Sequence, residues 1–429
     1  MDNQPMSTMK KLRPWIIWGL AASFFFSHYV ARVTPGIIVD DLKLAFINTT
    51  ELEIGFLGAA FYLPYVIMQM PVGYLVDKFG PRLLLTVAVF LCGISSLLFA
   101  SASMFEMAIA SRIVLGFCSA TAFVGALKLI TTWFKPSQLA MIVGITQALG
   151  MAGASVGNGL APYLVSAVGW RSAFTCYSVV FFILSILIFT IVRNRPKHKI
   201  SDTSTLNTSK SRPTAQKGAF KKVLLSRYTW LNAIFAGLLY APSDVMGELW
   251  GKQFLKNIHL ITDHQAEIAV SLLFVGWAVG GPIAGWLADH FGRRPIMTFS
   301  SLCSLIILPL IFYCSSITLP LLFILTFTFG LTNTGLIASY TVAGELHDKE
   351  VAGFSMAIAN MFSVLLGAML MPLLGWLITY HSQARVIDGL VQYSAQDYQK
   401  ATLILPICAL LAFVLSFFIK ETLVKEKRS

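Results

Sequence analysis

Two stretches decide the fold: Gly73-Tyr-Leu-Val-Asp77-Lys-Phe-Gly80-Pro-Arg82 and Gly285-Trp-Leu-Ala-Asp289-His-Phe-Gly292-Arg-Arg294. Their glycines, aspartates and final arginines have the same spacing, so a single offset along the chain, from position 73 to position 285, relates every pair. Each stretch follows a long apolar run. A chain that repeats a charged loop at a fixed offset between apolar runs is built from two equivalent halves.

The composition indicates the class of protein. Of the 429 residues, 56% are hydrophobic and 12% are charged, and the mean hydropathy is +0.72. Soluble domains carry about 25% charged residues. The chain therefore has more apolar surface than a water-soluble fold of its size can bury. This excludes a water-soluble enzyme and indicates an integral membrane protein.

Apolar runs long enough to cross a bilayer occur twelve times, since a spanning helix needs about 20 residues. They cover residues 15–39, 53–76, 83–103, 106–133, 139–166, 170–192, 229–251, 265–288, 295–316, 319–343, 352–380 and 401–420. We therefore predict an all-α membrane protein of twelve transmembrane helices in two pseudo-symmetric six-helix halves. The halves cover residues 1–192 and 228–429, and a basic cytoplasmic linker over 193–227 joins them.

The distribution of basic residues predicts the orientation. If both termini are cytoplasmic, 23 of the 32 Lys and Arg residues lie in cytoplasmic segments, 6 lie outside and 3 lie within the spans. This is the positive-inside pattern. The net charge of +12 is spread between apolar runs and not gathered on one face, so we expect the lipid bilayer as partner and no nucleic acid. The compact loops favour a bacterial inner membrane, and we expect a monomer.

Five charged residues interrupt the apolar runs: Arg32, Arg112, Lys128, Asp244 and Glu248. A charge at the centre of a membrane helix costs about 2.5–3.5 kcal/mol on insertion scales, so each needs a partner or a purpose. The repeat offset relates Arg32 to Asp244, which thus occupy equivalent places in the two halves. A rise of about 1.5 Å per residue puts both at a similar depth, toward the outer surface. They can form a salt bridge, or Arg32 can receive the carboxylate of a substrate.

Hydrogen-bonding residues inside the spans are further candidates for a substrate site. They are Tyr65 and Gln69, one turn apart in span two after Tyr62; Tyr240, one turn before Asp244; and Asn333 in span ten. Polar side chains of this kind also hold membrane helices together. The spacing between Arg112 and Lys128 puts the two on opposite helix faces unless the helix bends, and Lys128 can also snorkel toward the inner surface.

In these features the chain resembles the major facilitator superfamily. That family carries G-x-x-x-D-x-x-G-[R]-[RK] between spans two and three, with a degenerate copy between spans eight and nine. It also carries Arg-x-x-x-Gly early in span four, matched here by Arg112 and Gly116. The first loop departs from the pattern, because Pro81 stands where the family usually has Arg.

The resemblance implies alternating access, with spans one and seven lining the cavity and Arg112 acting in proton coupling or cavity electrostatics. It also implies that the repeated loops gate the transport path. The gating residues would be Gly73, Asp77, Gly80, Arg82, Gly285, Asp289, Gly292 and Arg294. The alternative is that these residues set only topology and folding.

The sequence contains no motif for enzymatic chemistry or nucleotide binding, so we expect a non-enzymatic protein without metal or cofactor, driven by an ion gradient. The leading hypothesis is a secondary transporter that takes up a carboxylate-bearing solute, an amino acid or a short peptide, with a proton. Its substrate-binding residues would be Arg32, Arg112, Lys128, Tyr65, Gln69, Tyr240 and Asn333, and its proton-coupling residues Asp244 and Glu248.

Three alternatives stay open. The first is symport of a sugar acid or another organic anion, the second is efflux of a drug or siderophore, and the third is a transport-like sensor. Span five is glycine-rich from Gly150 to Gly159 but lacks the Gly-Pro pair common in exporters of the family, which favours uptake.

Overall fold

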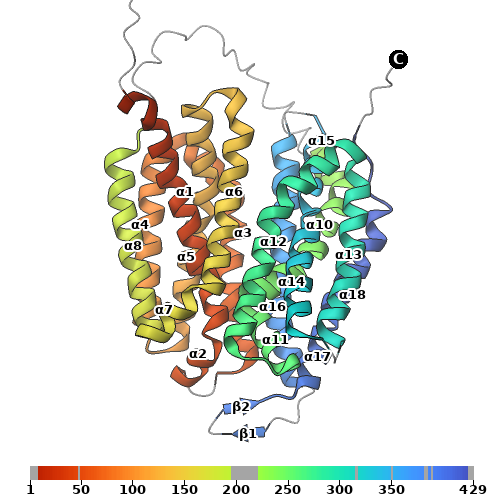
Figure 1. The fold of residues 1–429 in the computed structure, drawn as a ribbon. Helices are drawn as coiled ribbons and strands as arrows, with labels where there is room; N and C mark the ends of the chain where they lie inside the picture. Colours follow the sequence, from red (N-terminus) through yellow and green to blue (C-terminus); the bar gives the residue numbers. More distant parts are fainter. Residues whose placement is uncertain are drawn as a thin grey trace, which may run out of the picture.

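The structure, a computed structural model, describes residues 8–46, 49–194, 221–314, 317–348, 351–380, 385–387 and 390–423. In this part of the chain nearly all regular structure is helical (Figure 1). Most of the linker predicted over 193–227 lies outside the described residues. The other described residues form two bundles of membrane-spanning helices, which confirms the predicted all-α membrane fold.

The N-terminal bundle contains the first six membrane crossings. They are α1 (Thr8–Ile37), α3 (Glu51–Phe79), α4 (Pro81–Ala100), α5 (Phe105–Trp133), α6 (Pro136–Gly159) continued by α7 (Ala161–Val168), and α8 (Trp170–Ile191). A short helix, α2 (Val39–Ala45), connects the first two crossings.

The C-terminal bundle begins with a broken crossing: α10 (Arg227–Val245), a π-helical turn η1 (Met246–Trp250) and α11 (Gly251–His259). It continues with α12 (Asp263–Phe291), α13 (Arg293–Tyr313), α14 (Leu319–Asn333) with α15 (Leu336–Glu345), and α16 (Ala352–Tyr380). The last crossing combines α17 (Ala395–Thr402) and α18 (Ile404–Ser416). Between α16 and α17 lies a small antiparallel hairpin of β1 (Arg385–Ile387) and β2 (Leu390–Gln392).

Ten of the described helical segments are long and apolar enough to cross a membrane. The other two predicted spans, over 139–166 and 229–251, are helical at the expected places as α6 with α7 and as α10 with η1. The second of these two spans is the more polar, because it contains Pro242 and two carboxylates.

The internal repeat extends to the ends of the helices. Thr50 caps the start of α3 and Thr262 caps the start of α12, each with a reciprocal capping box. The same offset relates these two threonines. Gly80 ends α3 with φ +79° and Gly292 ends α12 with φ +112°, a backbone region that glycine enters without steric cost. The two loops therefore turn in the same way because they hold glycine at the same place.

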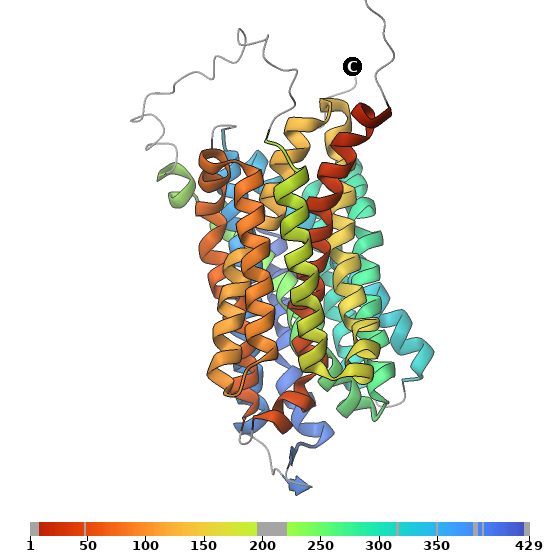
Figure 2. The same cartoon turned by 90° about the vertical axis from the view of Figure 1, so that its left-hand side faces the viewer.

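The bundle has two distinct ends, and Figure 2 shows its helices running along the axis that joins them. We call the end where α1 begins and α18 finishes the terminal face, at the top of Figure 1, and the opposite end, with β1 and β2, the hairpin face. The two halves meet where α3 packs against α16 and α6 against α12.

The halves are bonded to each other from the middle of the bundle to the hairpin face. The pairs are Arg32–Asp244, Arg32–Glu248, Tyr62–Asp244, Ser155–Ser271, Asn158–Gly247, Tyr163–His264, Ile37–Lys252, Asp40–Gln253, Asp40–Lys256 and Glu51–Tyr393. Toward the terminal face, by contrast, a Cβ atom placed on Gly73 or Gly285 would have no neighbouring atom within 4 Å. The structure is therefore closed at the hairpin face.

Candidate functional site

A buried arginine where the two halves meet, nearer the hairpin face than the terminal face, organises the site. Arg32 of α1 is 3% exposed, and its guanidinium lies 2.8 Å from Oε1 of Glu248 and 3.4 Å from Oδ1 of Asp244. It also donates a hydrogen bond of 2.7 Å to the hydroxyl of Tyr62 in α3. The structure thus joins Arg32 and Asp244, the two intramembrane charges that the repeat offset placed at equivalent positions.

The two carboxylates come from the broken crossing of the C-terminal half. Asp244 lies in the last turn of α10 and Glu248 lies in the π-helical turn. Pro242, one turn before Met246, has no N–H to donate to the oxygen of Leu238 within α10. Among the described residues, Oδ2 of Asp244 and Oε2 of Glu248 accept no hydrogen bond. Both buried acids therefore retain an acceptor atom for a proton or for an external donor.

Glycine lets the neighbouring helix approach Asp244. A Cβ atom on Gly367 of α16 would lie 2.5 Å from Oδ2 of Asp244, so any larger residue there would displace the carboxylate. Close helix contacts of this kind are typical of small residues in membrane proteins.

Aromatic rings surround the guanidinium of Arg32. Its central carbon lies 4.9 Å from the ring of Tyr29, 5.3 Å from Phe61 and 4.8 Å from Tyr62. Such rings attract a cation through their faces and exclude water. They favour a charged Arg32 in a region of low dielectric constant.

A second arginine lies beside the first. Arg112 of α5 is 3% exposed and donates hydrogen bonds of 3.0 Å to the backbone oxygen of Arg32 and 3.4 Å to that of Ala31. Its guanidinium also lies 5.0 Å from the ring of Phe61. Two arginines and two carboxylates thus share one buried region, and their formal charges balance.

Tyr65 and Tyr240 lie on the terminal side of this charged group. Tyr65 is one helical turn beyond Tyr62 in α3 and stacks on Phe61 with a ring separation of 5.8 Å. Tyr240 is one turn before Asp244 and packs edge-to-face on Trp277 at 5.3 Å. Both side chains are half-buried, as is Gln69 one turn further along α3. These three predicted residues therefore lie between the charged group and the terminal face.

Lys128 lies away from the charged group, on the terminal side of α5. Its ammonium lies 2.6 Å from Oδ1 of Asp77, and the two side chains are 45% and 66% exposed. The predicted substrate residue is therefore bonded to the repeated loop, because α5 turns Lys128 and Arg112 to different faces and depths.

Asn333 holds helices of the C-terminal half together in this conformation. Its amide donates to the backbone oxygen of Leu239 and to Ser304, and its oxygen accepts from Ser243. The side chain is fully buried and all its hydrogen bonds are internal. Asn333, which the sequence analysis names as a substrate-binding candidate, joins helices of one half in this conformation.

The first repeated loop is bonded within its own half. Arg82 donates to the backbone oxygen of Phe189 through Nε at 2.9 Å and Nη2 at 2.7 Å. Its backbone N–H donates to Asn194, which also packs against Gly80. In this conformation the loop fastens α4 to the end of α8 and makes no bond to the other half among the described residues.

The second loop forms its ion pairs through Arg293, the neighbour of the predicted gating residue Arg294. Arg293 pairs with Asp289 and lies 3.1 Å from Glu345. Arg293 points inward at the start of α13, whereas Arg294 contributes its backbone N–H, which donates to Glu421 at 2.9 Å. Glu421 also accepts from the backbone N–H of Arg293, so it caps α13 from the far end of the chain.

Several residues at the hairpin face were missed by the sequence analysis. Lys252 of α11 donates to the backbone oxygen of Ile37 at 2.8 Å, and Gln253 and Lys256 bond to Asp40 at 3.0 and 3.3 Å. We call this group the hairpin-face latch. The repeat offset relates Asp40 to Lys252, so opposite charges at equivalent positions were a signal in the sequence.

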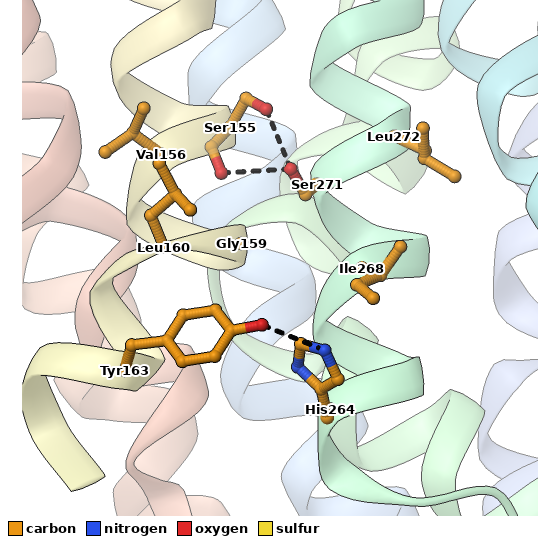
Figure 3. Close-up of a pocket in the computed structure, with 9 residues that line it drawn as sticks. All are labelled: Ser155, Val156, Gly159, Leu160, Tyr163, His264, Ile268, Ser271 and Leu272. Atoms are coloured by element: carbon orange, nitrogen blue, oxygen red, sulfur yellow. Dashed lines mark hydrogen bonds between the residues drawn. The ribbon is translucent and has the colours of Figure 1, made fainter. Parts of the chain in front are cut away.

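A second contact between the halves lies beside a cavity of about 280 Å³ between α6 and α12 (Figure 3). Tyr163 and His264 are 3.0 Å apart at one end, and Ser155 and Ser271 are 2.7 Å apart at the other. None of the nine residues that line this cavity belongs to the charged group around Arg32. The cavity therefore belongs to the interface between the two halves and not to the charged site.

Comparison with known proteins identifies relatives of the chain. The sequence profile of the Major Facilitator Superfamily matches residues 17–249 and 244–429. A probable sulfoacetate transporter of Cupriavidus necator is 26% identical over 284 residues, which cover 65% of this chain and 66%, just under two thirds, of that protein. A probable galactarate/D-glucarate transporter of Escherichia coli K12 is 22% identical over 388 residues, 82% of this chain and 85% of that protein.

The fold has a close counterpart among solved structures. A bacterial homologue of the human lysosomal transporter Spinster, in an inward-facing and unoccupied conformation, aligns with a TM-score of 0.75. The alignment covers 95% of this chain and 98% of the other at 14% sequence identity, so it supports the fold alone.

Proposed function

The chain belongs to the Major Facilitator Superfamily and is a secondary transporter, and we propose that it carries a small organic anion, a sugar acid or a sulfonated carboxylate, together with a proton. We further propose that the terminal face lies in the cytoplasm of a bacterial cell, because the basic residues concentrate in segments on that side. With the hairpin face closed, the structure then corresponds to an inward-facing state.

One observation carries the proposal: Arg32 is buried where the two halves meet, between two acids that each retain a free acceptor atom. A guanidinium is well suited to a carboxylate or sulfonate, because its N–H groups match two anionic oxygens. Tyr65, Gln69 and Tyr240 on the terminal side supply hydrogen-bonding groups for hydroxyls of a sugar acid.

The charge balance of the site suggests how a proton is coupled. Arg32 and Arg112 offset Asp244 and Glu248, so an arriving anion leaves the buried region with excess negative charge. In a medium of low dielectric constant this excess is costly. Protonation of Asp244 or Glu248 removes it, and the same step frees Arg32 from one of its ion pairs to receive the anion.

The relatives favour an organic anion over the amino acid or short peptide that led the sequence analysis. Their names refer to sulfoacetate and to galactarate or D-glucarate. Both kinds of compound are carboxylates without an ammonium group. The Arg32 site agrees with this chemistry equally well, so the substrate hypothesis shifts to the organic-anion alternative.

Uptake by purified protein in proteoliposomes tests the proposal. We expect labelled D-glucarate or sulfoacetate to enter faster with an inward proton gradient, and L-alanine and dialanine not to enter. Arg32→Gln should abolish both gradient-driven uptake and counterflow. Asp244→Asn or Glu248→Gln should retain counterflow but lose stimulation by the gradient, because an uncharged acid analogue cannot release a proton.

A matched control is Arg171→Gln, since the hydrogen bonds that Arg171 donates among the described residues go to the backbone oxygens of Ala100 and Ala102, outside the site. That variant should transport as the unmodified protein does. If folded protein moves no anion, or moves the amino acid or dipeptide instead, the proposal is wrong. Export of cationic or neutral compounds would then be the better hypothesis.

A further inference from the structure

Pro35 leaves one backbone oxygen of α1 without its normal partner. The helix continues through Pro35 to Ile37, but proline has no N–H to donate to the oxygen of Ala31 one turn earlier. An unpaired carbonyl is unfavourable in a bilayer, where no water replaces the missing donor. The oxygen of Ala31 therefore needs a donor from another helix.

Arg112 is that donor. Its Nη1 lies 3.4 Å from the oxygen of Ala31 and its Nη2 lies 3.0 Å from the oxygen of Arg32. Both of these hydrogen bonds go to the backbone of α1, and Arg112 forms no ion pair with any described residue. The guanidinium thus fastens α5 to the segment of α1 that carries Arg32.

The fastened segment is also where α1 touches the other half. A Cβ atom on Gly36 would lie 2.8 Å from the backbone oxygen of Glu248 and 3.0 Å from Cα of Leu249. This backbone contact runs beside the ion pair of Arg32 with Glu248. A shift of α1 near Pro35 would therefore move the guanidinium of Arg32 and separate it from its acids.

We propose that Arg112 is a positioning residue: it replaces the hydrogen bond that Pro35 removes from α1 and so holds Arg32 at the anion site without touching the anion. This differs from the substrate-binding role predicted from sequence. It rests on the proposed function only in taking Arg32 as the anion site.

The test is a double-mutant cycle between Arg112→Met and Pro35→Ala. Alanine at position 35 restores the N–H that the oxygen of Ala31 lacks, so the loss of Arg112 should matter less in that background. We expect Arg112→Met alone to raise the KM for D-glucarate about tenfold, the usual cost of one charge-assisted hydrogen bond, with a smaller change in Vmax. With Pro35→Ala the rise should be less than about threefold.

A direct contact between Arg112 and the anion predicts a different result, in which Arg112→Met raises the KM by the same factor in both backgrounds. That outcome would overturn the proposal. Arg171→Met is the matched control, because Arg171 also donates to two backbone oxygens but lies away from Arg32 and Pro35. It should lower the melting temperature without changing the KM and without any coupling to Pro35→Ala.

The melting temperature without substrate gives a second readout. Arg112→Met should lower it more in the unmodified background than with Pro35→Ala, and equal losses would contradict the proposal. This measurement does not depend on transport. If the protein moves no organic anion, the proposed function fails while the cycle of melting temperatures still decides the role of Arg112.

Discussion

At the scale of single residues, Tyr62 connects the two sides of the site. Its hydroxyl accepts from Arg32 at 2.7 Å and donates to Asp244 at 3.2 Å, so it aligns the cation with one acid. The Tyr62 side chain is 1% exposed, so water cannot replace these two hydrogen bonds if a substitution removes them. Removing the hydroxyl alone keeps the packing and breaks this connection.

We predict that Tyr62→Phe raises the KM for the transported anion about tenfold, the usual effect of losing a hydrogen bond to a charged group. The measurement is uptake into proteoliposomes at a fixed proton gradient. Tyr313→Phe is the control, since the Tyr313 hydroxyl donates to the backbone oxygen of Gln399, away from Arg32. An unchanged KM in Tyr62→Phe would show that Arg32 does not need this alignment.

The sequence predicted the central pair but not the role of every candidate. Arg32 and Asp244 were predictable because charges inside apolar runs are rare and these two obey the repeat offset. Lys128 and Asn333 show what sequence leaves open. The direction in which each side chain points, and the partner it meets, depends on helix rotation and on neighbours distant in the chain. The choice between Arg293 and Arg294 depends on the same rotation.

At the scale of secondary structure elements, α13 depends on a residue far along the chain for its cap. The backbone N–H groups of Arg293 and Arg294 both donate to Glu421. Burial acts to raise the pKa of Glu421, but the N–H groups of Leu423, Arg294, Arg293 and Thr422 outweigh it and hold the pKa below its usual range. The folded state therefore favours the ionised carboxylate.

We predict that Glu421→Ala lowers the free energy of unfolding by about 1 kcal/mol at pH 7.5, the usual cost of losing a helix cap. Because the folded-state pKa is depressed, this stabilisation is present above the usual carboxylate pKa and is lost as the pH falls through the depressed value. The melting temperature of Glu421→Ala should lie below that of the unmodified protein at pH 7.5, and this difference should become smaller as the pH is lowered. Asp348→Ala is the control variant. If the difference in melting temperature between Glu421→Ala and the unmodified protein does not change with pH, the prediction is wrong.

The positions of the helices were the part of the structure that the sequence predicted best, because twelve apolar runs and the glycines that end α3 and α12 indicate where helices lie. Two elements depart from this pattern. The π-helical turn η1 packs on α1, where Gly36 and Glu248 meet. The hairpin of β1 and β2 is short, and nothing in its composition separates it from an ordinary loop.

At the scale of the whole molecule, the hairpin-face latch holds one side closed. Asp40 of the N-terminal half accepts from both Gln253 and Lys256 of the other half. The ion pair of Lys256 and Asp40 is partly exposed, at 33% and 42%, so it contributes modestly. A weak latch suits a transporter, since the halves must separate here in every cycle.

We predict that Asp40→Ala shifts the population about fivefold toward a state open at the hairpin face, the equivalent of about 1 kcal/mol. Spin labels on Leu44→Cys and Leu260→Cys, both exposed on opposite halves, measure the separation in a background without the exposed Cys176 and Cys314. Glu106→Ala, on the same face but exposed and within one half, is the control. An identical distance distribution in Asp40→Ala would rule out the latch.

Because Arg32 and Asp244 occupy equivalent positions in the repeat, their charges also affect whether a half pairs with the other half or with a copy of itself. If two copies of the N-terminal half paired about the same axis, Arg32 would face a second Arg32, and two copies of the C-terminal half would bring Asp244 against Asp244. Buried like charges oppose such assemblies. The two equivalent positions thus carry opposite charges, Arg32 in one half and Asp244 in the other, and this difference favours pairing between unlike halves over pairing between like halves.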